Sequence, residues 1–195
     1  MPSPRAKNDT DNERDATTPR FFRFQKRSRR RPRPGDLFVM RERADPGRYL
    51  HGLVVRTDAD ISRTGHAGSL IYLFNRLTDE PRPVDDPIAT MRPANLLLPP
   101  IITNRRPWTM GLFRTIDDDS YSIDDFELLD PHIFDAVIPT SRRFVNEHGD
   151  PVDAETVTAM TRHMTHHHPR PFLEAGVVGY LYIDELAGEA LGWEK

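Results

Sequence analysis

The stretch Arg29-Arg30-Arg31-Pro32-Arg33-Pro34-Gly35-Asp36-Leu37-Phe38-Val39-Met40 decides how the chain is organised, because the composition switches there. Before it the chain is polar, basic and poor in apolar residues, and after it short β-type runs alternate with turn residues. Pro34 fixes its own φ and disfavours helix at Arg33, while Gly35-Asp36 suits a tight turn. We therefore expect the folded body to begin at residue 35, with a turn that feeds its first strand.

The charge is distributed as unevenly as the composition. The 195 residues carry 27 Lys and Arg and 30 Asp and Glu, a net charge of -3. Residues 1–34 hold 11 basic and 4 acidic residues (net +7), which leaves 16 basic and 26 acidic residues (net -10) for the remainder. We expect a disordered tail over residues 1–19, a basic arm over 20–34, and a single β-rich domain over 35–195.

Three interpretations of the basic arm stay open. It can be a solvated, disordered segment, as its low content of apolar residues favours. Phe21, Phe22 and Phe24 alternate with cations, so the arm could instead stack on the bases of a nucleic acid. The same pattern could also pack as a strand onto the body.

Composition excludes several classes of protein. The chain has no cysteine, which rules out disulfides, thiolate catalysis and cysteine-ligated zinc. Its first 18 residues contain no apolar run typical of a secretory signal, and no window reaches the length of a membrane helix. We expect a cytoplasmic protein with no membrane partner.

The body is predicted to be mainly β (α+β). Expected strands cover residues 37–41, 49–57, 70–75, 95–104, 108–116, 144–146 and 177–183. The apolar run 70–75 indicates a central strand buried on both faces, whereas Pro99-Pro100 makes 95–104 an edge strand or a bend. Helical spacing of apolar residues predicts helices over 156–166 and 183–193. This order favours a small antiparallel sheet or a partly open barrel with one or two helices, one of them C-terminal.

Five landmarks, taken in order, resemble the immunity protein 26 family of bacterial polymorphic toxin systems. They are the stretch 29–38, Tyr49–Val55, Leu70–Phe74, 96–104 followed by Trp108 and Gly111, and 182–185 leading to 190–192. Leu53 stands where that family has an arginine. The resemblance implies a cytosolic protein without chemistry of its own, which binds and neutralises a cognate toxin. It also marks Pro34, Gly35, Asp36, Asn104, Trp108 and Gly111 as shared positions, for which we expect structural roles.

A histidine cluster near the end of the helix predicted over 156–166 is the first candidate for chemistry. His163 and His167 are i,i+4 neighbours on a predicted helix, and His166 and His168 adjoin them. A zinc protease would need Glu after the first histidine, but Met164 stands there. We therefore expect a polar helix end, with no metal and no cofactor.

Five carboxylates lie within nine positions at Asp117, Asp118, Asp119, Asp124 and Asp125. A calcium-binding hand starting at Asp117 would need Gly at its sixth position and Glu at its twelfth, where Ser122 and Leu128 stand. The cluster is thus either a solvated loop or a surface for a basic partner, such as a toxin that acts on nucleic acid.

Motifs for nucleophilic or phosphoryl chemistry are missing from the sequence. It has no Gly-x-Ser-x-Gly elbow and no phosphate-binding loop ending in Lys-Ser or Lys-Thr. We expect no enzyme. The first hypothesis is an immunity protein that sequesters a protein toxin, for which a nuclease is one fitting class. The alternative is a nucleic-acid-binding barrel that uses the basic arm.

Overall fold

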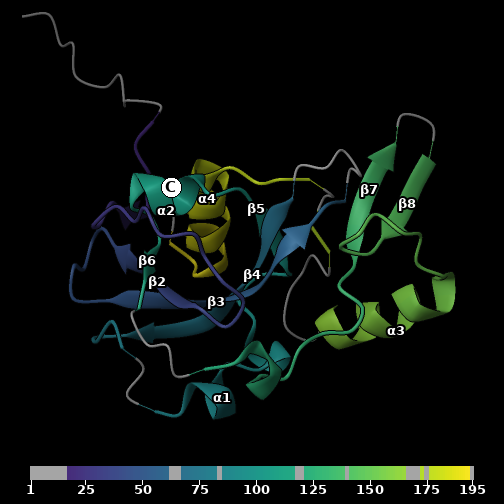
Figure 1. Ribbon diagram of the computed structural model, residues 1–195, viewed down its shortest axis with the longest axis horizontal. Helices are drawn as coiled ribbons and strands as arrows, with labels where there is room; N and C mark the ends of the chain where they lie inside the picture. The colour runs from purple at the N-terminus through teal and green to yellow at the C-terminus, as the bar shows by residue number, and fades with distance from the viewer. Residues whose placement is uncertain are drawn as a thin grey trace, which may run out of the picture.

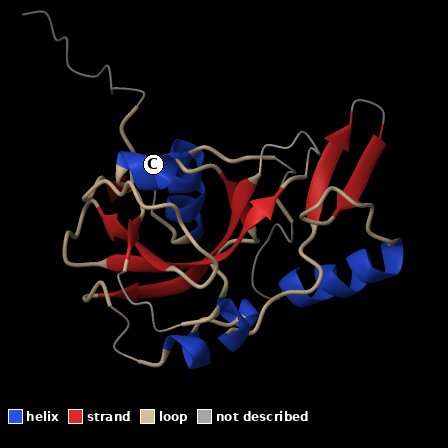
Figure 2. Cartoon of the chain, viewed as in Figure 1, coloured by secondary structure: helices blue, strands red, loops and turns tan. Residues whose placement is uncertain are grey.

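The fold centres on one antiparallel sheet between two apolar layers (Figures 1 and 2). The computed structural model describes residues 17–61, 67–82, 85–116, 121–138, 141–165, 172–173 and 176–193. Within them the six-stranded sheet has the order β1-β2-β3-β4-β5, with β6 paired to the same edge of β2 as β1. The sheet is open, so the structure is α+β and not a closed barrel.

The strands confirm the central features expected from the sequence. They are β1 (Phe22–Arg23), β2 (Leu37–Glu42), β3 (Tyr49–Ala59), β4 (Gly68–Thr78), β5 (Ile101–Thr103) and β6 (Arg114–Thr115). The continuous apolar run of β4 is buried on both faces, since β3 and β5 flank it and an apolar layer covers each side. The segment 95–104 is both a bend and an edge, because Leu96 bridges Phe74 before the two prolines and β5 follows them.

The turn at residues 33–36 forms as the sequence indicates. The Asp36 N–H donates to the Arg33 carbonyl at 3.0 Å, and Gly35 adopts φ +87°. The Asp36 carboxylate accepts from the Arg33 N–H at 2.8 Å and from the Arg30 guanidinium at 2.8 Å. Gly35 and Asp36 also exchange backbone hydrogen bonds with Val54 of β3 at 2.9 Å each. The turn therefore sets the start of β2 against β3.

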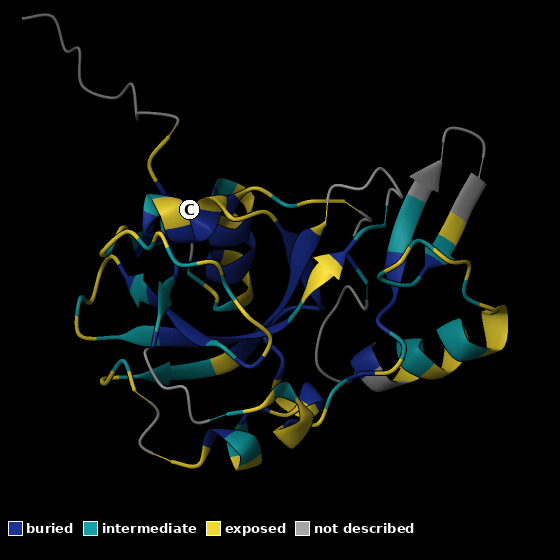
Figure 3. Ribbon diagram, viewed as in Figure 1, coloured by how far each residue is buried: buried dark blue, intermediate teal, exposed yellow. Residues whose placement is uncertain are grey.

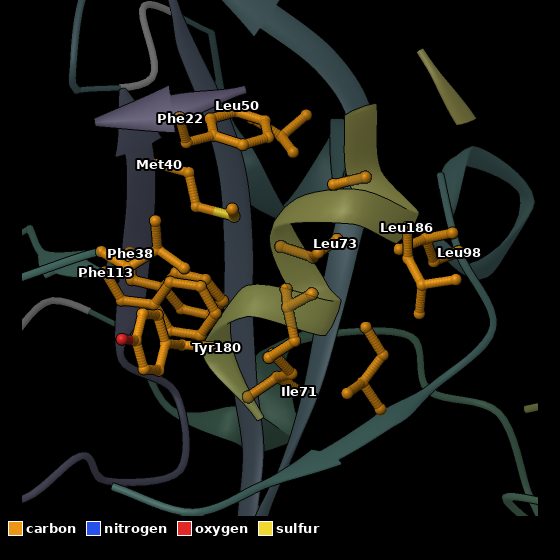
Figure 4. Packing of buried hydrophobic residues seen from close by; sticks show 14 of the residues in the cluster. Phe22, Phe38, Met40, Leu50, Ile71, Leu73, Leu98, Phe113, Tyr180 and Leu186 are labelled. Atoms are coloured by element: carbon orange, nitrogen blue, oxygen red, sulfur yellow. The ribbon is translucent and has the colours of Figure 1, made fainter. Parts of the chain in front are cut away.

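One face of the sheet packs against α2 (Arg106–Met110) and α4 (Tyr180–Ala190) (Figure 4). Phe38, Met40, Leu50, Ile71 and Leu73 of the strands share one apolar cluster with Ile183 and Leu186 of α4. Phe38 crosses the sheet over Gly52, where an added Cβ would lie 2.3 Å from the ring. This approach explains the glycine inside β3.

The other face is covered by later parts of the chain. These are α1 (Pro87–Thr90), the 3-10 turns η1 (Pro93–Asn95) and η2 (Ile123–Asp125), the hairpin β7 (Phe134–Ile138) and β8 (Ser141–Val145), and α3 (Ala154–Thr165). Phe126, Leu129, Phe134, Val145 and Met164 bury their side chains in this second layer. Figure 3 shows the sheet as buried, with exposed positions on the outer face of α3. Helix α3 confirms the helix predicted over 156–166.

Two predicted strands are wrong. Residues 108–116 form α2, then a turn at Gly111, and only then β6. Pro107 occupies the first helical turn, the Asn104 side chain accepts from the Arg106 N–H at 2.8 Å, and Gly111 ends the helix at φ +86°. These are helix start and stop signals that outweigh the β-prone composition. Residues 177–183 likewise give only a bridge between Val178 and Thr103 before α4 begins.

The described part of the basic arm is packed onto the domain, as the strand alternative allows. Phe22 is fully buried and pairs with Glu42 through β1. The Asp184 carboxylate of α4 accepts from the backbone N–H groups of Arg20 at 2.5 Å, Phe21 at 3.1 Å and Phe22 at 2.8 Å. The predicted tail over residues 1–19 lies outside the described residues except for 17–19.

Candidate functional site

The acidic turn η2 is the described part of the predicted partner surface. Asp117, Asp118 and Asp119 lie outside the described residues, whereas Asp124 and Asp125 are both exposed. The Asp125 carboxylate accepts from the Ser122 N–H at 2.9 Å, and the Ser122 hydroxyl accepts from the Asp124 N–H at 3.4 Å. Asp125 is thus occupied in capping the turn, and Asp124 projects into solvent.

This acidic turn lies against the Pro34-Gly35 turn. A Cβ on Gly35 would sit 2.8 Å from the Tyr121 carbonyl and 3.2 Å from the Ile123 nitrogen. Tyr121 packs edge-on against Phe126, with ring centroids 5.9 Å apart. The structure therefore joins two groups of predicted residues that are about 90 positions apart in the sequence, and holds Asp124 on a fixed support.

A cleft of about 540 Å³ forms a second candidate site. Three separated segments line it: residues 26–30, the turn 80–82 after β4, and residues 114–116 of β6 and beyond. Its basic residues are Lys26, Arg27, Arg29, Arg30, Arg82 and Arg114, and Glu80 is the one carboxylate among the described lining residues. We call this the basic cleft.

Backbone contacts hold the first wall of the basic cleft in place. The Gln25 N–H donates to the Gly111 carbonyl at 2.6 Å, and the Ser28 N–H donates to the Trp108 carbonyl at 3.0 Å. The Arg105 guanidinium donates to the Arg29 carbonyl. Gly111 permits this approach, because a Cβ there would lie 2.5 Å from the Gln25 carbonyl oxygen. The cations at 26–30 are therefore presented by a docked segment.

The opposite wall carries an aromatic contact. The Arg114 guanidinium lies 6.0 Å from the centre of the Tyr49 ring, and the Arg41 guanidinium lies 5.9 Å from it. Strand β6 fixes Arg114 by pairing it with Val39 of β2. Cation–π contact orients these guanidinium planes beside the cleft.

A buried polar network joins the sheet to the β7–β8 hairpin. The Tyr72 hydroxyl lies 2.7 Å from His132 Nε2 and accepts from the Leu129 N–H at 3.0 Å. His132 Nδ1 lies 3.4 Å from Glu147 Oε1, which also accepts from the Arg56 guanidinium at 2.8 Å. With the proton on Nδ1, every one of these contacts pairs a donor with an acceptor.

Electrostatics and burial make this network a structural connection. Burial would raise the pKa of Glu147, but the hydrogen bond from His132 and the charge of Arg56 outweigh it and lower that pKa to about 2. Burial raises the pKa of Tyr72 above its ordinary value. Tyr72 and His132 are both buried, whereas Glu147 and Arg56 keep side-chain exposures of 13% and 28%, so solvent reaches the network only at that end. Its Tyr, His and Glu are residue types that also form catalytic relays, but its tyrosine and histidine are out of reach of a substrate.

Three of the positions marked by the resemblance to the immunity protein 26 family lie in or beside α2. Asn104 caps the start of the helix, Gly111 ends it, and Trp108 is fully buried. The indole packs edge-on against Phe38 and Phe113, with centroids 5.7 Å and 4.9 Å away. Pro34, Gly35 and Asp36 form the turn described above. All six positions thus support the fold where they stand.

The described residues contain no group of three His, Asp or Glu side chains placed to hold a metal ion. His166, His167 and His168 lie outside them, and the side chain of His163 is not described. In the same part of the chain, no helix is long and apolar enough to cross a membrane.

Sequence reasoning missed the basic cleft and the buried network. Arg82 and Arg114 are isolated cations in the sequence, and only the pairing of β6 with β2 brings Arg114 towards residues 26–30. The four cations at 26–30 are the available signal, but the sequence leaves open whether the arm is disordered, contacts a nucleic acid or packs onto the body. Tyr72, His132 and Glu147 carry no local motif.

Comparison with known proteins does not assign a function to this chain, so its function has to be inferred from the residues described above. Neither the protein-family models, nor the curated proteins, nor the solved structures give a match to this chain.

Proposed function

We propose that this protein is a cytoplasmic immunity protein that binds a cognate toxin and neutralises it without chemistry of its own. Three observations support the proposal. The sequence landmarks resemble the immunity protein 26 family, the Tyr72 and His132 side chains of the polar network are buried, and an acidic turn is exposed on a fixed support. The exposed turn carries the proposal, since it is a preformed surface for a basic partner.

Electrostatics explains why an acidic surface suits this task. Toxins that attack nucleic acids present positive charge where the phosphate binds, and a negative surface can compete for that site. Opposed potentials accelerate encounter and penalise wrong partners, while charges at an interface rim add less to the final affinity. Asp124 is the described residue best placed to act so, and Asp117–Asp119 extend the acidic stretch in the sequence.

The test is association kinetics with the toxin encoded beside the gene for this chain. Replacing Asp117, Asp118, Asp119 and Asp124 with Asn should slow association more than it speeds dissociation, and added salt should shrink the difference. For a control matched in charge, Asp124→Asn alone is compared with Glu185→Gln, because Glu185 is an exposed carboxylate on α4, across the sheet from the acidic turn.

Two outcomes would contradict parts of the proposal. Unchanged association rates at low salt would remove the acidic turn from the contact surface and leave the immunity function standing. A neighbouring toxin that is neither bound nor neutralised by the wild-type protein would overturn the function itself.

A further inference from the structure

We propose that the basic cleft binds the phosphodiester backbone of a single-stranded nucleic acid. This activity goes beyond toxin neutralisation and does not rest on it, because the cleft and the acidic turn are lined by different residues. The inference starts from charge, continues with the chemistry of the donors, and ends with the scaffold that holds them.

The positive charge of the cleft favours a ligand with several negative charges. Six cations and one carboxylate line it among the described residues, although Arg30 is already paired with Asp36 at 2.8 Å. A single phosphate monoester carries at most about two negative charges, fewer than Lys26, Arg27, Arg29 and Arg114 carry together. A strand with one charge per nucleotide supplies several anions in succession.

The donors favour phosphate. Five of the six cations are arginines, whose planar forks bind phosphate oxygens in pairs, and Ser28 and Thr115 add hydroxyl groups. An acidic peptide could also meet the arginines. A nucleic acid could in addition stack a base on an arginine guanidinium such as that of Arg114, which an acidic peptide cannot do.

The scaffold makes the cleft a built site. Residues 25–29 are held against α2 and the turns beside it by hydrogen bonds to their backbone, so the backbone that carries their cations needs little ordering when a ligand binds. Phe21 and Phe22 pack against Trp193, with centroids 6.2 Å and 5.2 Å away, and are unavailable for stacking. Binding should therefore be electrostatic and tolerant of sequence.

The experiment measures fluorescence anisotropy of a labelled oligothymidylate with the full-length protein over a series of salt concentrations. The test variant is Arg27→Gln with Arg29→Gln, two exposed cations of the cleft. The control variant is Arg92→Gln with Arg143→Gln, which removes the same charge from exposed positions outside the cleft. Circular dichroism checks that both variants fold.

The cleft variant should bind about tenfold more weakly at low salt, and the slope of log K against log salt should fall by about 0.7 for each lost contact. The control should match wild type. Equal loss in both variants, or no salt-dependent binding by wild type, would overturn the proposal. So would a poly-glutamate competitor that displaces the oligonucleotide as well as unlabelled nucleic acid does, since it would assign the cleft to an acidic protein. Inorganic phosphate or a mononucleotide competing at equal phosphate concentration would assign it to small phosphates.

Discussion

At the scale of single residues, Glu147 shows how one carboxylate joins distant parts of the chain. It accepts from Arg56 of β3 and contacts His132, which in turn meets Tyr72 of β4. No sequence pattern predicts such a network, because its members are tens of positions apart and none of them belongs to a motif in its own segment. The Pro34-Gly35-Asp36 turn is the opposite case, since backbone preference alone predicts it.

The depressed pKa of Glu147 predicts a dependence of stability on pH. Its folded pKa of about 2 lies below its ordinary value of 4.5, so the stabilisation is present above about pH 4.5 and is lost as pH falls towards 2. Glu147→Gln should lower the free energy of unfolding at neutral pH by about 1.5–3 kcal/mol, the range for hydrogen bonds to charged groups.

Urea unfolding of both proteins from pH 7 to pH 2.5 measures the effect. The two curves should converge as the solution becomes acidic, and the exposed Glu127→Gln should follow wild type throughout. A constant difference between Glu147→Gln and wild type at every pH would refute the coupling.

At the scale of elements, α2 shows where pattern reasoning fails and which signal would have succeeded. The β-prone residues of 108–116 predict a strand, yet Asn104, Pro107 and Gly111 fix a short helix before β6. Apolar composition is common to helix and strand in short segments, so the capping residues decide. Strand β4 was predictable because burial on both faces leaves a continuous apolar run.

Gly111 serves both the end of α2 and the docking of the basic segment. Gly111→Ala places a Cβ at a positive φ and within 2.5 Å of the Gln25 carbonyl oxygen. We expect a loss of at least about 1 kcal/mol in the free energy of unfolding, from the backbone strain alone. Gly176→Ala is the matched control, because no atom lies within 4 Å of its added Cβ. Equal stability of the two variants in urea would contradict the role of Gly111.

At the scale of the whole molecule, the first and last described segments of the chain meet on one face of the sheet (Figure 1). The backbone N–H groups of residues 20–22 donate to the Asp184 carboxylate, and Phe21 and Phe22 pack with Trp193. The basic segment and the acidic body are therefore not separate modules, and the positive charge of residues 26–30 is fixed in the basic cleft. Sequence composition detects the charge asymmetry but not its location, which depends on contacts between distant segments.

Truncation of the chain tests whether the folded domain includes β1. A chain that starts at residue 17 should keep the wild-type free energy of unfolding, whereas one that starts at residue 25 loses β1 and the fully buried Phe22. The chain that starts at residue 25 should lose about 3–5 kcal/mol of its free energy of unfolding, as for removal of a core phenylalanine. Calorimetry or urea unfolding compares the two. Equal stability would show that the domain begins after β1, close to residue 35.

The hydrogen bonds between Asp184 and Arg20–Phe22 also bear on how the protein is made. They join residues 162 to 164 positions apart, and the acceptor belongs to α4. Ribosomes synthesise the amino end first, so Phe22 emerges long before its partners in α4 exist. This face of the core can therefore close only after α4 has been synthesised. Until then the nascent chain exposes an aromatic, cationic segment that a chaperone for unfolded chains would bind.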